Sequence, residues 1–192
     1  MAEHDEPEQA RGESNACREL WRIIGNEDIS LDYRDRAAEK LEQVAERGDA
    51  YAQYWMGQLY RDGPLLIPDN RKAKQWLTQA AKQGLSEAQY ALGKLLLSDD
   101  PEVRDPDEGI RCLKQAAESG DHFAAYRLGK EYLTGKFVQK DAVKAAEYLR
   151  YAADNNHPWA SYLLGKLYLI GNDVPKDEEA AWNCFCMADA YG

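Results

Sequence analysis

The sequence lacks the long apolar segments that mark membrane and secreted proteins. No apolar run approaches the roughly 20 residues that a membrane-spanning helix needs. The first residues, MAEHDEPEQARGES, are acidic and contain no apolar stretch of the kind found in a secretory signal. We therefore expect a cytoplasmic protein in which residues 1–12 form a short disordered acidic tail.

Cysteine and histidine are scarce, and the common catalytic motifs are missing. The chain has four cysteines and three histidines, without a CxxC pair and without ligand partners at metal spacing. There is no phosphate-cradling glycine-rich loop, no GxSxG and no HExxH, and no Cys or Ser has a recognisable base partner. We therefore expect no enzymatic activity, no metal and no cofactor. We expect reduced, mostly packing thiols at Cys17, Cys112, Cys184 and Cys186.

Positive charge is in short supply. The chain has 24 Lys and Arg against 34 Asp and Glu, which gives a formal net charge of -10. Binding to phosphates needs clustered Lys and Arg, so we expect neither direct nucleic-acid binding nor binding to an anionic membrane. This expectation concerns the whole surface and leaves room for a local basic stripe.

The sequence does contain a repeated segment. AQYWMGQLYRDG, AQYALGKLLLSD, AAYRLGKEYLTG and ASYLLGKLYLIG follow one another at a fixed interval, so that Gly57, Gly93, Gly129 and Gly165 share one phase. A second block repeats in phase at Ala80, Ala116, Ala152 and Ala188. A fixed period between 20 and 50 residues predicts a repeat architecture. A degenerate copy stands in front, with Trp21 where the later copies have glycine.

Each copy is predicted to form two helices joined by a turn of about seven residues. Apolar residues recur at three- and four-residue spacing in both halves, as Ala52, Met56 and Leu59 illustrate. An in-phase aspartate precedes each second helix, where its side chain can cap free backbone N–H groups. These aspartates are Asp69, Asp105, Asp141 and Asp177. The Gly or Asn that closes a unit suits a left-handed C-terminal cap.

The repeated glycine lies in the middle of the first helix, where it costs about 1 kcal/mol relative to alanine. Such a cost at four equivalent positions requires a packing reason. We therefore expect a neighbouring helix to approach too closely for a Cβ atom, in a stack of helical hairpins that bury their faces against one another.

The segment AQYWMGQLYRDG…DNRKAKQWLTQAAKQG resembles the Sel1-like repeat, a relative of the tetratricopeptide repeat. The match is good over 49–192 and loose over 13–48, and the segment LLLSDDPEVRDPDEGI departs from it by losing the loop glycine and the Lys-Ala pair. The resemblance implies an all-α fold, a right-handed α/α superhelix of five helical hairpins with a 36-residue period. We expect one repeat domain over 13–192, with the degenerate unit 13–48 followed by units 49–84, 85–120, 121–156 and 157–192.

The resemblance also implies a function. Sel1-like proteins are usually binding modules in signalling, quality control or bacterial host interaction, which suggests an adaptor or scaffold for a protein or peptide. An architectural spacer within a larger bacterial protein, for example a plasmid mobilisation relaxase, is the alternative. The two differ in whether the concave face engages a partner.

A tetratricopeptide-like array would present the first helix of each pair on its concave face. Tyr and Lys four residues apart share a helix face, so stacked copies would make an aromatic ladder beside a basic one. Such a groove suits an extended or helical peptide that carries carboxylates. The candidate stripe consists of Arg18, Arg22, Tyr51, Tyr54, Trp55, Gln58, Tyr90, Lys94, Phe123, Tyr126, Lys130, Trp159, Tyr162 and Lys166.

Alternative interpretations of these residues stay open. The tyrosines belong to the repeat consensus and can simply pack between helices, and the lysines can form a solvated face. Trp55, which has no aromatic counterpart in the other copies, either contacts a partner or fills space against the loop. Trp76 and Trp182 fall on second-helix stripes and are expected to face the core.

The last unit suggests that the array continues or associates beyond Gly192. Its second helix follows the repeat consensus, and a solenoid end needs a polar capping face. We expect Trp182, Phe185, Cys186 and Met187 to keep part of their surface unpartnered. A longer array is the first interpretation, self-association through the C-terminal face the second, and an attached helix the third.

Overall fold

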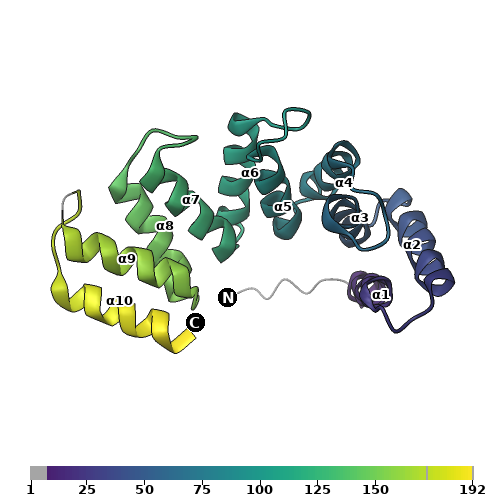
Figure 1. The fold of residues 1–192 in the computed structure, drawn as a ribbon, viewed down its shortest axis with the longest axis horizontal. Helices are drawn as coiled ribbons and strands as arrows, with labels where there is room; N and C mark the ends of the chain where they lie inside the picture. The colour runs from purple at the N-terminus through teal and green to yellow at the C-terminus, as the bar shows by residue number, and fades with distance from the viewer. Residues whose placement is uncertain (1–7, 172, 192) are drawn as a thin grey trace. The chain divides into compact units, whose positions relative to one another are not determined.

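The computed structural model describes residues 8–171 and 173–191, which form ten α-helices and no strands (Figure 1). The segment predicted to be a degenerate repeat copy contains α1 (Glu8–Gly25) and α2 (Leu31–Glu46). The later helices are α3 (Ala50–Asp62), α4 (Asn70–Lys82), α5 (Ser86–Leu96), α6 (Pro106–Glu118), α7 (His122–Thr134), α8 (Ala142–Asp154), α9 (Pro158–Ile170) and α10 (Glu178–Tyr191). The predicted all-α architecture is confirmed.

In the structure residues 8–12 belong to the first turns of α1, while the domain bounds, including a tail over residues 1–12, stay a prediction. The sequence there, EQARG, contains Glu, Gln, Ala and Arg, which are good helix formers, and an acidic residue at a helix N-terminus is favourable. Residues 1–7 of the predicted tail lie outside the described residues.

The chain divides into two compact units, each described by itself. The first runs to Leu95 and includes Asp100–Val103, and the second contains Leu96–Asp99 and everything from Arg104 onward. In the first unit α1 packs against α2, α2 against α3, and α3 against α4. In the second unit α6 packs against α7, α7 against α8, α8 against α9, and α9 against α10. Consecutive helices therefore stack in chain order, as a helical-repeat array requires.

The predicted caps are confirmed. The carboxylate of Asp141 accepts a hydrogen bond from the backbone N–H of Lys144 at 3.0 Å, and Asp69, Asp105 and Asp177 act in the same way at α4, α6 and α10. The unit-closing residues Gly48, Gly84, Gly120 and Asn156 all have positive φ angles. Residues 63–69 and 135–141 form the predicted turns between paired helices, and residues 171 and 173–177 lie between α9 and α10.

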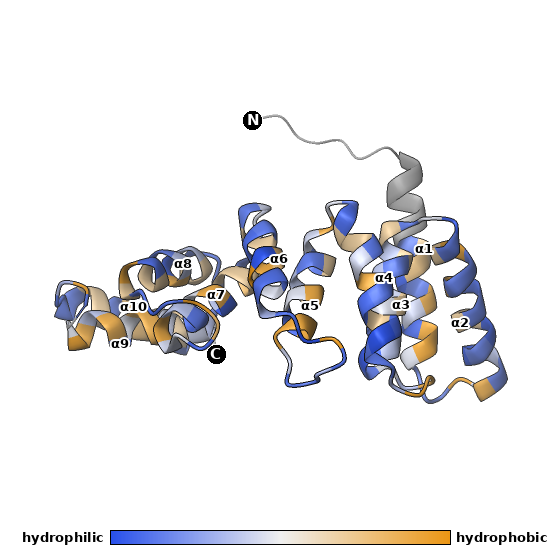
Figure 2. Cartoon of the chain, turned by 90° about the horizontal axis from the view of Figure 1, so that it is seen from above, coloured by the Kyte–Doolittle hydropathy of each residue, from blue (hydrophilic) through white to orange (hydrophobic). Residues whose placement is uncertain are grey.

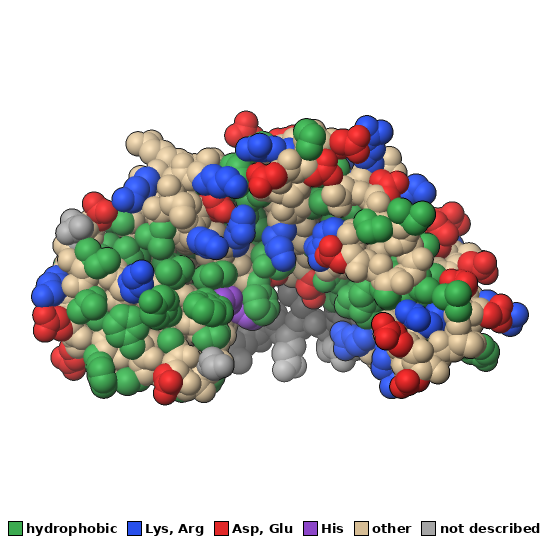
Figure 3. All heavy atoms as spheres, in the orientation of Figure 1, with side chains coloured by type: hydrophobic (Ala, Val, Ile, Leu, Met, Phe, Trp, Pro, Cys, Tyr) green, Lys and Arg blue, Asp and Glu red, His purple; other side chains and the backbone are tan. Residues whose placement is uncertain are grey.

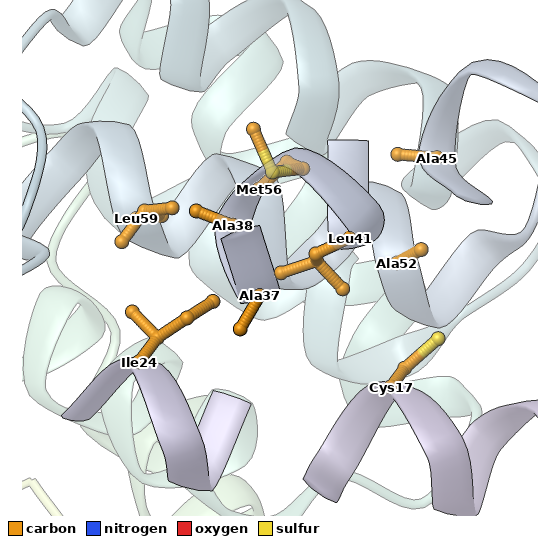
Figure 4. Packing of buried hydrophobic residues seen from close by; sticks show 9 residues of the cluster. All are labelled: Cys17, Ile24, Ala37, Ala38, Leu41, Ala45, Ala52, Met56 and Leu59. Atoms are coloured by element: carbon orange, nitrogen blue, oxygen red, sulfur yellow. The ribbon is translucent and has the colours of Figure 1, made fainter. Parts of the chain in front are cut away.

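The core of the first unit joins helices α1, α2 and α3 (Figure 4). Ile24, Leu41, Met56 and Leu59 are buried there, with small alanines from α2 and α3 between them. Trp76 of α4 packs against this cluster half-buried, which agrees with the predicted core-facing position.

The mid-helix glycines lie at close helix contacts in both units. A Cβ atom added at Gly57 would lie 2.6 Å from Cγ of Leu77, and one added at Gly165 would lie 2.8 Å from Cε1 of Phe185. Real Cβ atoms essentially never come this close to another heavy atom. The predicted reason for the repeated glycine is therefore confirmed at these positions.

Hydropathy is distributed unevenly along the helices (Figure 2). Helix α2 is mainly hydrophilic on its exposed side, whereas α9, with the sequence PWASYLLGKLYLI, carries hydrophobic residues along its length. Among the described residues no helix is both long and apolar enough to cross a membrane.

Candidate functional site

The candidate stripe lies on the first helices of the pairs, and its members differ in exposure. On α1, Arg18 and Arg22 are exposed, and Arg22 forms an ion pair with Glu19 at 2.7 Å. On α3, the side chains of Tyr51, Tyr54, Trp55 and Gln58 are half-buried. On α5, Tyr90 is half-buried and Lys94 is exposed. The second unit contributes exposed Phe123, Lys130, Trp159, Tyr162 and Lys166, and half-buried Tyr126.

On three helices the repeated tyrosine contacts the side chain four residues after it. The ammonium group of Lys94 lies 5.3 Å from the ring centroid of Tyr90, and that of Lys166 lies 5.7 Å from the ring centroid of Tyr162. Both distances are within the range of a cation–π contact. On α3 the equivalent Gln58 donates a hydrogen bond from Nε2 to the hydroxyl oxygen of Tyr54 at 2.8 Å.

Trp55 packs against Trp21, which stands where the later copies have glycine. Its ring stacks on the ring of Trp21 at a centroid distance of 4.8 Å and an interplanar angle of 22°. Both tryptophans are half-buried and lie beside the core of the first unit. This contact favours the space-filling interpretation of Trp55, because much of its ring already has a partner.

The second unit presents two large aromatic side chains in the same repeat phase. Phe123, at the start of α7, is 49% exposed, and Trp159, at the start of α9, is 64% exposed. Helices α7 and α9 contact each other directly. Trp159 also makes an edge contact with Tyr162 at a centroid distance of 6.3 Å.

The charges on α7 and α9 are mostly positive. Their only acidic residue, Glu131, is buried and forms an ion pair with Arg127 at 3.0 Å. Lys130 and Lys166 are exposed on the same two helices. A chain with a formal net charge of -10 therefore has a locally basic surface on these two helices.

Tyr126 packs between two helices, which is one of the two roles that the sequence left open for the repeated tyrosines. Its ring stacks on the imidazole of His157 at 4.2 Å, with an interplanar angle of 23°. His157 is only 8% exposed and caps α9, where its Nδ1 accepts a hydrogen bond from the backbone N–H of Ala160 at 3.3 Å. Tyr126 therefore joins α7 to the beginning of α9.

The environment of His157 favours the neutral imidazole. Burial lowers the pKa of His157, and the nearby imidazole of His122, at a centroid distance of 6.3 Å, lowers it further. Phe123 contacts the same ring edge-on at 5.5 Å. A capping acceptor must also be unprotonated at Nδ1, so the cap and the electrostatics agree.

Sequence reasoning missed the two histidines and misplaced Trp182. The available signal for His157 was its position, because Asp49 and Asp121 occupy the same phase and cap α3 and α7.

Trp182 was predicted to face the core, which is wrong, since its side chain is 70% exposed. Its position would face the core only if another element covered that side of α10.

One surface cavity of the second unit is not lined by the candidate stripe. It has a volume of about 620 Å³ and lies between α6, α7 and α8. Tyr132 and Tyr148 stack there at 5.8 Å, and the hydroxyl of Tyr151 donates to the carbonyl oxygen of Gly120 at 3.1 Å. These tyrosines hold neighbouring helices together. Among residues 8–171 and 173–191, no group of three or more His, Cys, Asp or Glu side chains could hold a metal ion.

The repeat phase, the caps and the glycine contacts together match one known family. A model of the Sel1 repeat matches residues 50–85, 86–121, 122–157 and 160–188. The chain belongs to the Sel1 repeat family. Sel1 repeats are generally scaffolds for protein interaction. Residues 13–48, predicted to be a degenerate copy, lie outside the four matched segments.

Solved structures of Sel1 repeat proteins share the fold. The chain is 29% identical to c5321, a protective antigen of uropathogenic Escherichia coli with an SLR fold, with a TM-score of 0.78. That match covers 94% of this chain but 39% of the antigen, so this chain spans less than half of that protein. A Sel1 repeat protein from Oxalobacter formigenes is 24% identical, with a TM-score of 0.80, over 98% of this chain and 76% of that one.

A third solved structure, the cysteine-rich protein B of Helicobacter pylori, is 27% identical with a TM-score of 0.52. The match covers 68% of this chain and 94% of that one. No curated protein sequence matches the chain. The fold is therefore an all-α solenoid of Sel1 repeats, while its right-handed sense and exact period stay predictions.

Proposed function

We propose that this Sel1 repeat chain is a non-catalytic adaptor that binds a partner protein along the first-helix stripe of α7 and α9. The observation that carries the proposal is the in-phase exposure of Phe123 and Trp159 on two helices that contact each other. Large aromatic side chains are the residues that most often dominate binding energy at interfaces.

The charges on these helices support an acidic partner. Lys130 and Lys166 occupy the same repeat phase as Lys94, and each lies four residues after a tyrosine. The ammonium group of Lys166 lies over the ring of Tyr162, which in turn contacts the ring of Trp159. A peptide with Phe or Leu side chains and interspersed carboxylates would satisfy both the aromatic and the basic groups.

An architectural role remains the second candidate. The match to a longer antigen, of which this chain spans 39%, supports a Sel1 array as one part of a larger polypeptide. A spacer would need no partner on the stripe, so one binding experiment separates the two candidates.

The experiment is affinity capture from the native organism, followed by binding measurements with the purified partner. The double substitution Lys130→Glu with Lys166→Glu should lower the affinity at least about tenfold, because both charges facing the partner are reversed. Lys40→Glu with Lys82→Glu, on α2 and α4, is the matched control with the same change in net charge. Equal loss in both double variants, or no loss in either, would place binding away from this stripe. A stripe that captures no partner would leave the spacer as the function.

A further inference from the structure

The outer side of helix α10 carries an apolar centre between acidic ends. Trp182 lies four residues after Glu178 and three after Glu179, and Cys186 and Asp189 follow it at four- and three-residue spacing. These five residues therefore lie along one side of the helix, here called the α10 stripe, with the adjacent Glu178 and Glu179 on its two edges. All five residues are exposed, and Trp182 is 70% exposed. Hydrophobic side chains gather over α9 and α10 in the space-filling view (Figure 3). Among the residues whose burial is described, six of the twelve exposed large hydrophobic residues lie in α9 and α10. A large exposed apolar area commonly marks an interaction site.

The repeat shows what usually covers this face. Residues at the phase of Trp182 in α2, α6 and α8 are Ala38, Ile110 and Ala146, and all three are buried. The copy in α4 is Lys74, which is half-buried and donates a hydrogen bond to the carbonyl oxygen of Val103 at 3.3 Å. Helices α2, α6 and α8 each pack against the first helix of the next pair. Ala146 belongs to the buried cluster that joins α8 to Ala160 and Leu164 of α9. The face of α10 is thus the equivalent of a face that binds a helix elsewhere in the same chain.

Its chemistry nevertheless differs from that of the internal faces. Asp189 stands at the phase of Ala45 and Ala153, which are buried. A helix packed on α10 as α9 packs on α8 would bury this carboxylate, which is costly without a cationic partner. Helix α10 has no Lys or Arg of its own, although Lys176 in the preceding turn pairs with Glu178 at 2.6 Å. The helix that fits must therefore supply positive charge near its ends.

A second copy of this chain fits poorly. An antiparallel pair of α10 stripes would bring Glu178 and Glu179 opposite Asp189 of the copy, and a parallel pair would align identical acids. Like charges placed opposite each other at an interface cost several kcal/mol. Self-association through this face, the second of the three interpretations drawn from the sequence, is thus disfavoured by charge, and the test below includes it as a competing outcome.

We propose that the α10 stripe binds a helix of a partner protein that has an apolar centre and Lys or Arg near both ends. Trp182 is the central anchor of this contact, with Cys186 beside it. The acidic ends select a basic helix and exclude a second α10. This surface is distinct from the stripe on α7 and α9, so binding at one does not depend on binding at the other.

The test uses two synthetic helical peptides of about four turns that share one apolar stripe. One peptide has Lys and Arg at both ends, and the other has Glu. Calorimetry with the full chain should show at least about tenfold tighter binding of the basic-ended peptide. Binding should also protect the exposed thiol of Cys186 from a maleimide reagent.

Variants separate this site from general attraction to an acidic chain. Trp182→Gln should lower the affinity for the basic-ended peptide at least about tenfold, because the residue is the proposed anchor. The melting temperature should stay unchanged, because the side chain is exposed. Ile67→Gln, which removes an exposed apolar side chain in the first unit, is the matched control and should bind normally. Glu179→Lys with Asp189→Lys should reverse the preference in favour of the acid-ended peptide.

Three results would overturn the proposal. The first is equal or absent binding of the two peptides. The second is normal binding by Trp182→Gln. The third is a dimer of the chain alone in light scattering that Trp182→Gln abolishes, which would make a second copy the occupant.

Discussion

Gly129 of α7 lies directly against Leu149 of α8, so that a Cβ atom at position 129 would be 2.7 Å from Cγ of the leucine. The carbonyl oxygen of Ala145 would lie 3.3 Å from the added Cβ atom. Backbone and side chain therefore confine the position together, and neither can move without disturbing the α7–α8 contact.

Gly129→Ala should lower the free energy of unfolding by about 1–3 kcal/mol through overpacking. Helix propensity alone predicts the opposite sign, a gain of about 1 kcal/mol. Urea denaturation measures the difference. Gly25→Ala is the control, because no atom lies within 4 Å of the added Cβ and the φ angle is not positive. Equal stability of the two variants would remove the close-packing explanation.

Trp21→Gly, which restores the repeat consensus, should destabilise the first unit by about 2 kcal/mol. The substitution removes a half-buried side chain and its stacking on Trp55, and an aromatic pair contributes about 0.5–1.5 kcal/mol beyond area burial. A double-mutant cycle with Trp55→Ala should isolate that pair energy. If the two substitutions are additive, the stacking contributes nothing measurable.

Stability should fall as the pH is lowered through the range in which histidines titrate. The pKa of His157 is lower in the folded chain than its ordinary value, so the unfolded chain binds the proton more readily. The stabilising contribution is complete above the unfolded pKa of about 6.5 and is lost as the pH falls toward the folded pKa. The melting temperature should be lower at about pH 5.5 than at about pH 7.5, two values that lie on either side of the ordinary pKa of histidine.

His157→Asn keeps a capping acceptor and removes the titration, so its melting temperature should change less between the two pH values. His122→Gln should reduce the dependence in part, because His122 contributes to the lowered pKa of His157. An NMR titration of the wild-type histidines supplies an independent check. A His157 pKa above its ordinary value would contradict the prediction.

Cys186 should react with a maleimide well before the other three thiols. It is exposed, whereas Cys17, Cys112 and Cys184 are buried. Burial raises the pKa of Cys112 to about 11, with the negative charge of Glu108 adding to the shift, and burial also raises the pKa of Cys184. Since the thiolate is the reactive form, both stay protonated near neutral pH.

Mass spectrometry of the native chain should therefore show one rapid modification, which Cys186→Ser removes. Modification of the other three thiols should be seen only in denaturant. Rapid modification of a second thiol in the native chain would mean that a helix contact opens more often than the structure indicates.

The sequence predicted those features that depend on local phase. The caps at Asp69 and Asp141 follow from a hydrogen bond within the first helical turn, and the left-handed Asn156 follows from its place at a unit end. The glycine contact was predictable because only close packing explains repeated glycine within a helix. Each of these conclusions needed no knowledge of distant residues.

The remaining features depend on contacts between units of the repeat. The stack of Tyr126 on His157 joins two helices whose facing side chains the repeat phase does not specify. Trp182 shares its phase with buried residues, and phase alone does not show whether another helix covers that side. The surface of α7 and α9 was predicted as a stripe, and its role in binding stays a proposal.

The glycine contacts are each contained within one hairpin, Gly57 with Leu77 and Gly129 with Leu149. A hairpin therefore closes on itself with residues that it carries, and only its outer faces must suit its neighbours. Duplication or loss of a whole hairpin leaves every remaining closure intact and requires adjustment at a single new junction. The length of such an array can thus change during evolution in steps of one hairpin, while insertion of a few residues within a helix would separate a glycine from its leucine.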